Sequence, residues 1–145
     1  ENILFRLAGA NLATNPPRVV VLLAGTNNLS LEPPDSPEDT VRAIGKLVDL
    51  LATECPEAAL FLLTLPPNGH DPDSALRGRV LETNRLLREL PLPDQASLID
   101  IYPVFADEDD RWRSGMTMDG THFSLAGYDH LARALRPATE VLRGR

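Results

Sequence analysis

Three short runs of this chain are predominantly apolar, and the longer segments between them repeat apolar residues every three or four positions. The runs cover residues 18–24, 58–65 and 96–101. Runs of this length and composition are typical of strands buried on both faces, as in a parallel sheet covered by helices. We therefore expect three parallel strands.

The spaced segments between the runs indicate helices. They cover residues 1–13, 36–55, 75–90 and 124–142. The second segment carries a strong helix-start signal, because Ser36 can cap it and Pro37 suits its first position. Pro137 should kink or interrupt the last helix, since proline removes a backbone donor. The remaining stretches, 25–35, 66–74 and 102–118, are expected to be turns and loops.

The alternation of helices and strands predicts one α/β domain over residues 1–145, with a parallel sheet covered on both faces. In sheets of this kind, binding sites lie beyond the carboxyl ends of the strands. Polar residues that follow the apolar runs are therefore the first candidates for chemistry.

Composition narrows the possible partners. The chain has a net charge of −7 and a pI near 4.9, which disfavours a nucleic-acid partner because phosphate binding needs clustered Lys and Arg. Its apolar runs are far too short for a membrane span. A single cysteine, Cys55, excludes an internal disulfide framework and leaves the cellular compartment open.

Two polar motifs suit acyl-transfer chemistry. Asp119 and His122 are three residues apart, so the carboxylate can hold the Nδ1 proton and leave Nε2 free to accept a proton from a nucleophile. Asn27 follows the first apolar run, where its amide can donate to a developing oxyanion. Both motifs are expected at the carboxyl edge of the sheet, facing one cleft.

Gly25-Thr26-Asn27-Asn28 and Asp119-Gly120-Thr121-His122, followed by Gly127-Tyr128, together resemble the SGNH hydrolases, also called the GDSL esterase/lipase family. The resemblance implies a three-layer, flavodoxin-like sandwich. It also implies a serine esterase in which Asp119 and His122 complete the triad and Asn27 is the oxyanion donor. Substrates of that family include acetylated sugars, lipids and thioesters, and no metal or organic cofactor is implied.

The resemblance further places Gly25, Asn28 and His70 at the substrate pocket. For Asn28, a role in bracing the turn is the stronger alternative. His70 begins a loop with metal-capable side chains, but their irregular spacing favours a plain loop, and we expect no metal site. The consecutive acids of residues 107–110 are likewise expected to be a solvated loop.

The nucleophile is the missing part of the resemblance. The family's Gly-Asp-Ser segment does not occur, and none of the six serines has that context: Ser30, Ser36, Ser74, Ser97, Ser114 and Ser124. We expect a strand, a helix and a second strand, about 40–60 residues, to lie outside this chain and to supply the serine as a companion N-terminal segment or chain. The main alternative is a binding or scaffold module that keeps the fold without catalysis.

Overall fold

The computed structural model describes residues 2–10, 12 and 14–144. It contains a three-stranded parallel sheet of order β1-β2-β3. The strands are β1 (Val19–Leu22), β2 (Ala59–Leu63) and β3 (Ala96–Ile99). All three predicted strands are therefore confirmed, and each is shorter than the apolar run that indicated it.

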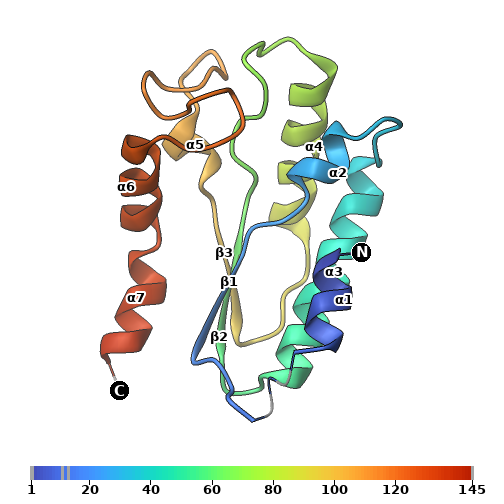
Figure 1. Cartoon of the computed structure of the whole chain (residues 1–145), viewed down its shortest axis with the longest axis vertical. Coiled ribbons are helices and arrows are strands. Elements are labelled where there is room, and N and C mark those ends of the chain that lie inside the picture. The colour runs from blue at the N-terminus through green and yellow to red at the C-terminus, as the bar shows by residue number, and fades with distance from the viewer. Residues whose placement is uncertain (1, 11, 13, 145) are drawn as a thin grey trace.

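Helices cover both faces of this sheet (Figure 1). The longer ones are α3 (Pro37–Glu54) and α4 (Ala75–Glu89) on one side, and α6 (Leu125–Ala134) and α7 (Arg136–Arg143) on the other. The α/β class and the flavodoxin-like layering expected from the sequence are confirmed.

The start of α3 and the break in the last helical segment agree with the residues that predicted them. The Ser36 hydroxyl accepts a hydrogen bond from the backbone N–H of Asp39 at 3.0 Å and caps α3. Pro137 stands in the first turn of α7, and the helical path breaks at Leu135 between α6 and α7, so the predicted interruption is confirmed.

Three short elements differ from the prediction. The first helix, α1 (Asn2–Ala8), ends before Gly9, because glycine is a poor helix former; residues 1, 11 and 13 of the predicted helix lie outside the described residues. Two short helices, α2 (Thr26–Ser30) and α5 (Tyr102–Phe105), occupy stretches expected to be turn or loop. Helices of five and four residues are too short to show helical periodicity in a sequence.

The core is divided between the two faces of the sheet. On one face, the apolar stripe of α3, which includes Ile44 and Leu47, packs with Leu60 and Leu62 of β2. On the other face, Phe105 packs with Phe123 and Leu131. Cys55 follows α3 with only 1% of its surface exposed, and burial raises the pKa of its thiol.

An amide from α4 fixes the chain where it leaves β2. The Oδ1 atom of Asn84 accepts from the backbone N–H of Leu65 at 2.7 Å, and its Nδ2 donates to the Leu65 carbonyl at 2.8 Å. Asn84 is fully buried, so both bonds are shielded from water. The loop after β2 therefore starts from a fixed point, at the end of the sheet where the candidate residues lie.

Candidate active site

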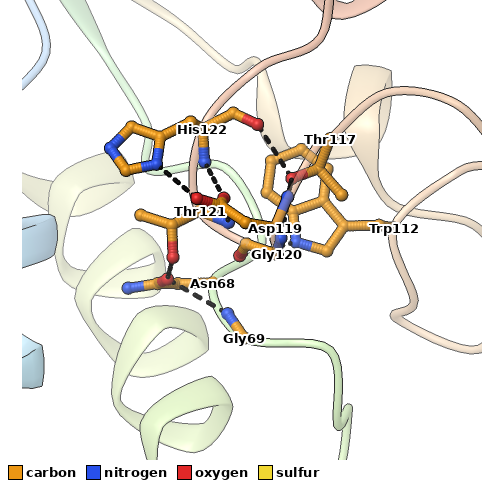
Figure 2. Close-up of polar contacts among 8 residues, drawn as sticks. All are labelled: Asn68, Gly69, Trp112, Thr117, Asp119, Gly120, Thr121 and His122. Atoms are coloured by element: carbon orange, nitrogen blue, oxygen red, sulfur yellow. Dashed lines mark hydrogen bonds and ion pairs between the residues drawn. The ribbon is translucent and has the colours of Figure 1, made fainter.

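The acid–base pair lies in a tight loop just before α6 (Figure 2). The Nδ1 atom of His122 is 2.7 Å from Oδ2 of Asp119, which is the hydrogen bond expected from the spacing. The other carboxylate oxygen accepts the backbone N–H of His122 at 2.8 Å and that of Thr121 at 2.9 Å. With Nδ1 donating to the carboxylate, Nε2 is the nitrogen available to accept a proton.

These hydrogen bonds determine the electrostatics of the pair. The pKa of Asp119 lies well below its usual range, chiefly because the His122 backbone N–H donates to it, and then because of the His122 side chain and the Thr121 N–H. Asp119 is therefore a carboxylate over the whole neutral range. The side chains of His122 and Asp119 are 72% and 52% exposed, so the pair is open to a substrate from solvent.

Gly120 allows the neighbouring loop to approach this pair closely. Its φ of +85° is in the left-handed region, and its carbonyl accepts the Gly69 N–H at 2.8 Å and the Trp112 Nε1–H at 3.0 Å. A Cβ at Gly120 would lie 3.1 Å from the ring of His70. The structure thus brings His70, predicted at the substrate pocket, next to the acid–base loop.

Asn27 lies in α2, directly beyond the carboxyl end of β1. The turn into α2 needs Gly25, because its φ is +116° and a Cβ there would lie 2.9 Å from Cγ2 of Thr40. Asn27 is exposed, and among the described residues its side-chain amide has no hydrogen-bond partner. The amide is therefore free to donate to a ligand.

Asn28 is placed differently from its neighbour. Its Nδ2 donates to Oδ2 of Asp35 at 2.6 Å, and its carbonyl accepts the Asp35 N–H at 3.0 Å. This is the turn-bracing arrangement that was the stronger alternative for Asn28. Its contact with substrate stays a prediction.

Both motifs lie at the carboxyl end of the sheet, at the top of Figure 1: α2 follows β1, and the loop carrying His122 returns there after α5. A cavity of about 690 Å³ adjoins Asn27 and Gly25, and its apolar walls come from α1, the end of β1 and α3. His122 is not among the described residues that line it. That Asn27 and His122 face one cleft stays a prediction.

Sequence reasoning missed two residues beside the pair. Asn68 follows β2 and is only 2% exposed, and its Oδ1 accepts the Thr121 hydroxyl at 2.9 Å. A polar residue just beyond a buried strand was the available signal for Asn68. The partnership of Trp112 with Gly120 had no signal in the sequence.

The other candidate clusters are structural within the described ranges. In residues 107–110, Asp107 accepts the backbone N–H groups of Asp109 and Arg111, and Asp110 accepts the Tyr102 hydroxyl. No group of three or more His, Cys, Asp or Glu side chains is arranged to hold a metal ion in the part of the chain that the structure describes. No helix within those ranges is both long and apolar enough to cross a bilayer.

Comparison with known proteins identifies the family. A sequence model of the GDSL-like Lipase/Acylhydrolase family matches residues 2–130. The chain belongs to this family. Among curated proteins, the GDSL-like chain is 30% identical over 143 residues to rat "platelet-activating factor acetylhydrolase IB subunit alpha2", covering 98% of this chain and 59% of that protein. Human "platelet-activating factor acetylhydrolase IB subunit alpha1" is 30% identical over 136 residues, which cover 93% of this chain and 57% of that protein.

Solved structures share the GDSL-like fold. A GDSL-like lipase from Bacteroides thetaiotaomicron matches with a TM-score of 0.77 and 18% identity, covering 98% of this chain and 70% of that one. An acetylxylan esterase from Geobacillus stearothermophilus matches with a TM-score of 0.71 and 18% identity, covering 93% and 65%. The chain spans less than two thirds of the length of the curated relatives it matches.

Proposed function

We propose that this chain supplies the histidine, the aspartate and the oxyanion asparagine of a serine ester hydrolase. The observation that carries the proposal is the hydrogen bond between His122 Nδ1 and Asp119 at 2.7 Å, in a loop exposed at the carboxyl end of the sheet. An orienting carboxylate on one imidazole nitrogen is what a general base in acyl transfer requires. Membership of an acylhydrolase family supports the same reaction class.

The proposed reaction has two halves. A serine hydroxyl attacks the ester carbonyl while His122 Nε2 takes its proton, and the Asn27 amide donates to the oxyanion of the tetrahedral intermediate. His122 then gives its proton to the departing alcohol, leaving an acyl-serine. Water, activated by His122, hydrolyses that acyl group and restores the serine. Asp119 holds the imidazole orientation and stabilises its charged form throughout.

The nucleophile in this proposal comes from outside the chain. Three of its serines cap helices, Ser36 on α3, Ser74 on α4 and Ser124 on α6. The Ser30 hydroxyl donates to the carbonyls of Thr26 and Asn27 within its own helix. No serine hydroxyl bonds to His122 among the described residues. A companion segment or chain is therefore proposed to present the serine.

The sheet offers a place for that companion. β1 is an edge of the described three-stranded sheet, and Val21 is 41% exposed there. An open edge presents unpaired backbone N–H and C=O groups, which a further parallel strand would satisfy. We propose that the serine-bearing segment pairs with β1, which would bring its carboxyl end beside Asn27.

The proposed substrate is a small ester with a short acyl group, of an acetylated sugar or a lipid, or the corresponding thioester. Two named relatives are an acetylhydrolase and an acetylxylan esterase, and an acetyl ester is the substrate type that their names share. No metal or organic cofactor takes part in the proposed steps.

Hydrolysis of p-nitrophenyl acetate tests this function. This polypeptide alone is expected to be inactive, and the full-length protein, or the polypeptide combined with the serine-bearing segment, is expected to turn over. His122→Ala in the active form should lower kcat by ~10⁶-fold, the loss seen when a triad histidine is removed. Turnover by the polypeptide alone would place the nucleophile within it. A complete protein with no turnover would favour a binding module instead.

A further inference from the structure

A set of hydrogen bonds ties the loop of Asp119 and His122 to the loop after β2, and Asn68 joins Thr121 of the first loop to Gly69 of the second (Figure 2). Asn68 Oδ1 accepts the Thr121 hydroxyl at 2.9 Å and the Gly69 N–H at 3.0 Å. The same Gly69 N–H lies 2.8 Å from the Gly120 carbonyl. Residues more than fifty positions apart in the chain thus share one polar network.

We propose that Asn68 is a positioning residue, which holds Thr121 and thereby sets the place of the Asp119–His122 pair. The inference rests on the proposed function, in which that pair moves the proton. Asn68 itself touches neither member of the pair through a described hydrogen bond, so it acts through Thr121.

Thr121 connects Asn68 to Asp119 because it forms a hydrogen bond with each of them. Its hydroxyl donates to Asn68, and its backbone N–H donates to Asp119 Oδ1 at 2.9 Å. A shift of Thr121 therefore moves a donor of the carboxylate that orients His122. The N–H of Thr121 is also one of the groups that lower the Asp119 pKa.

Asn68 is itself fixed from two sides. Pro66 and Pro67 precede it and restrict the backbone, after Asn84 has fixed Leu65. From α4, the fully buried Arg77 donates through one guanidinium nitrogen to the Gly69 carbonyl at 2.9 Å and to the Asn68 carbonyl at 3.5 Å. A buried guanidinium that bonds to two carbonyls of one loop holds that loop against the helix.

The acid–base pair needs such support because burial does not hold it. Both side chains are more than half exposed, and the loop contains Gly115 and Gly120 at positive φ. An exposed loop with flexible residues keeps a reactive geometry only through its hydrogen bonds. A displacement of a catalytic group by about 1 Å can lower the rate by about 10²-fold. A contact made away from His122, such as that of Asn68, can therefore change the rate by changing the position of His122.

The first test compares substitutions at Thr121 and Asn68 in the full-length enzyme with p-nitrophenyl acetate. Thr121→Val removes the hydroxyl and keeps the side-chain shape, whereas Thr121→Ser keeps the hydroxyl. We expect Thr121→Val and Asn68→Ala each to lower kcat by ~10–10²-fold with little change in KM, because the substrate binds but the pair is misplaced. Thr121→Ser should return kcat to within ~3-fold of the parent.

A matched control and a double variant complete this test. Thr53→Val removes an exposed hydroxyl that donates only to Asp49 within α3, and it should leave kcat and KM as they are. Asn68→Ala combined with Thr121→Val should cost no more than the larger single loss, because each change alone already removes the hydrogen bond between Thr121 and Asn68. Losses that multiply, or a Thr121→Val enzyme with the parent's kcat and melting temperature, would overturn the proposal.

The second test is independent of ester turnover. The Nδ1–H proton of His122 should give a downfield NMR resonance in the full-length protein, since it bonds to a carboxylate at 2.7 Å. We expect Thr121→Val to shift or broaden it, and Thr121→Ser and Thr53→Val to preserve it. If the parent shows no esterase activity, this result still decides whether Thr121 and Asn68 position the pair. An unchanged resonance in Thr121→Val would overturn the inference even if the enzyme is active.

Discussion

The two halves of the candidate site are built in different ways. The Asp119–His122 half is held by backbone donors, by the loop after β2 and by Trp112. The Asn27 half depends on the turn at Gly25 and on a five-residue helix, and its amide has no described partner. The proposed acid–base half is therefore preorganised by this chain, whereas Asn27, the proposed oxyanion donor, presents a free amide beside an open cavity.

The contrast between the two halves suits the roles proposed for them. In the proposed reaction the base must be aligned beforehand, and the hydrogen bond that orients His122 is already made in the chain. In the same proposal the oxyanion donor must keep its N–H unpaired until the charge develops, and an amide without a described partner, such as that of Asn27, suits this role. Substitutions in the two halves should accordingly differ in their effects on kcat and on stability.

The largest expected effect is on the acid–base half. Asp119→Asn should lower kcat of the complete enzyme by ~10⁴-fold, because an amide donating to Nδ1 favours the wrong histidine tautomer. Esterase kinetics measure it, with Asp94→Asn as control, since Asp94 is exposed just before β3 at the opposite end of the sheet. A loss below ~10-fold would show that Asp119 does not orient the base.

The next effect belongs to the oxyanion half. Asn27→Ala should lower kcat by ~10²–10³-fold, the loss expected for one oxyanion donor. The melting temperature should change little, because no described side-chain hydrogen bond is removed. Asn15→Ala, an exposed amide before Pro16, is the matched control. Unchanged turnover by a folded Asn27→Ala enzyme would contradict the oxyanion role.

A third comparison tests how tightly the acid–base half is packed. A Cβ at Gly127 would lie 2.3 Å from the Met116 carbonyl oxygen, so Gly127→Ala should lower the free energy of unfolding by ~1–3 kcal/mol. Gly78 in α4 has nothing within 4 Å of such a Cβ, and Gly78→Ala should raise stability by ~0.5–1 kcal/mol. Urea unfolding measures both free energies. If Gly127→Ala changed the free energy of unfolding by the same amount as Gly78→Ala, the loop at Met116 would have moved away to make room for the added methyl group.

The smallest effect is a pH dependence of the same half. Because the folded pKa of Asp119 lies below the unfolded value of about 3.9, its carboxylate adds stability that is fully present above that value. This contribution should shrink as pH falls from about 4 through the lower folded pKa. Unfolding of the parent and Asp119→Asn at several pH values measures it. A difference that grows on acidification would contradict the hydrogen bonds described.

The sequence predicted the elements that have a strong local signal. The strands were visible because β1 and β2 are continuously apolar and β3 is predominantly so, and the start of α3 was visible through Ser36. The short helices α2 and α5 were missed because one turn of helix has no period to detect. Their positions depend on packing, for example of Leu29 and Phe105, which are fully buried.

In the candidate site, too, the contacts within one loop could be predicted from the sequence and those between loops could not. The hydrogen bond between Asp119 and His122 followed from a spacing of three residues, because it forms within one loop. The contact of Asn68 with Thr121 joins two loops, and only the fold brings them together. Asn28 makes another contact within one loop: its side chain bonds to Asp35, seven residues away, as expected of an amide that braces a turn.

The state of Cys55 has a practical use. It is the single cysteine of the chain, its side chain is shielded, and burial disfavours the thiolate that reacts with alkylating dyes. A cysteine introduced by Met118→Cys, at a position 73% exposed and next to Asp119, would therefore be labelled selectively. Fluorescence from that one dye would follow ligand arrival beside His122 in real time, with the native cysteine left in place.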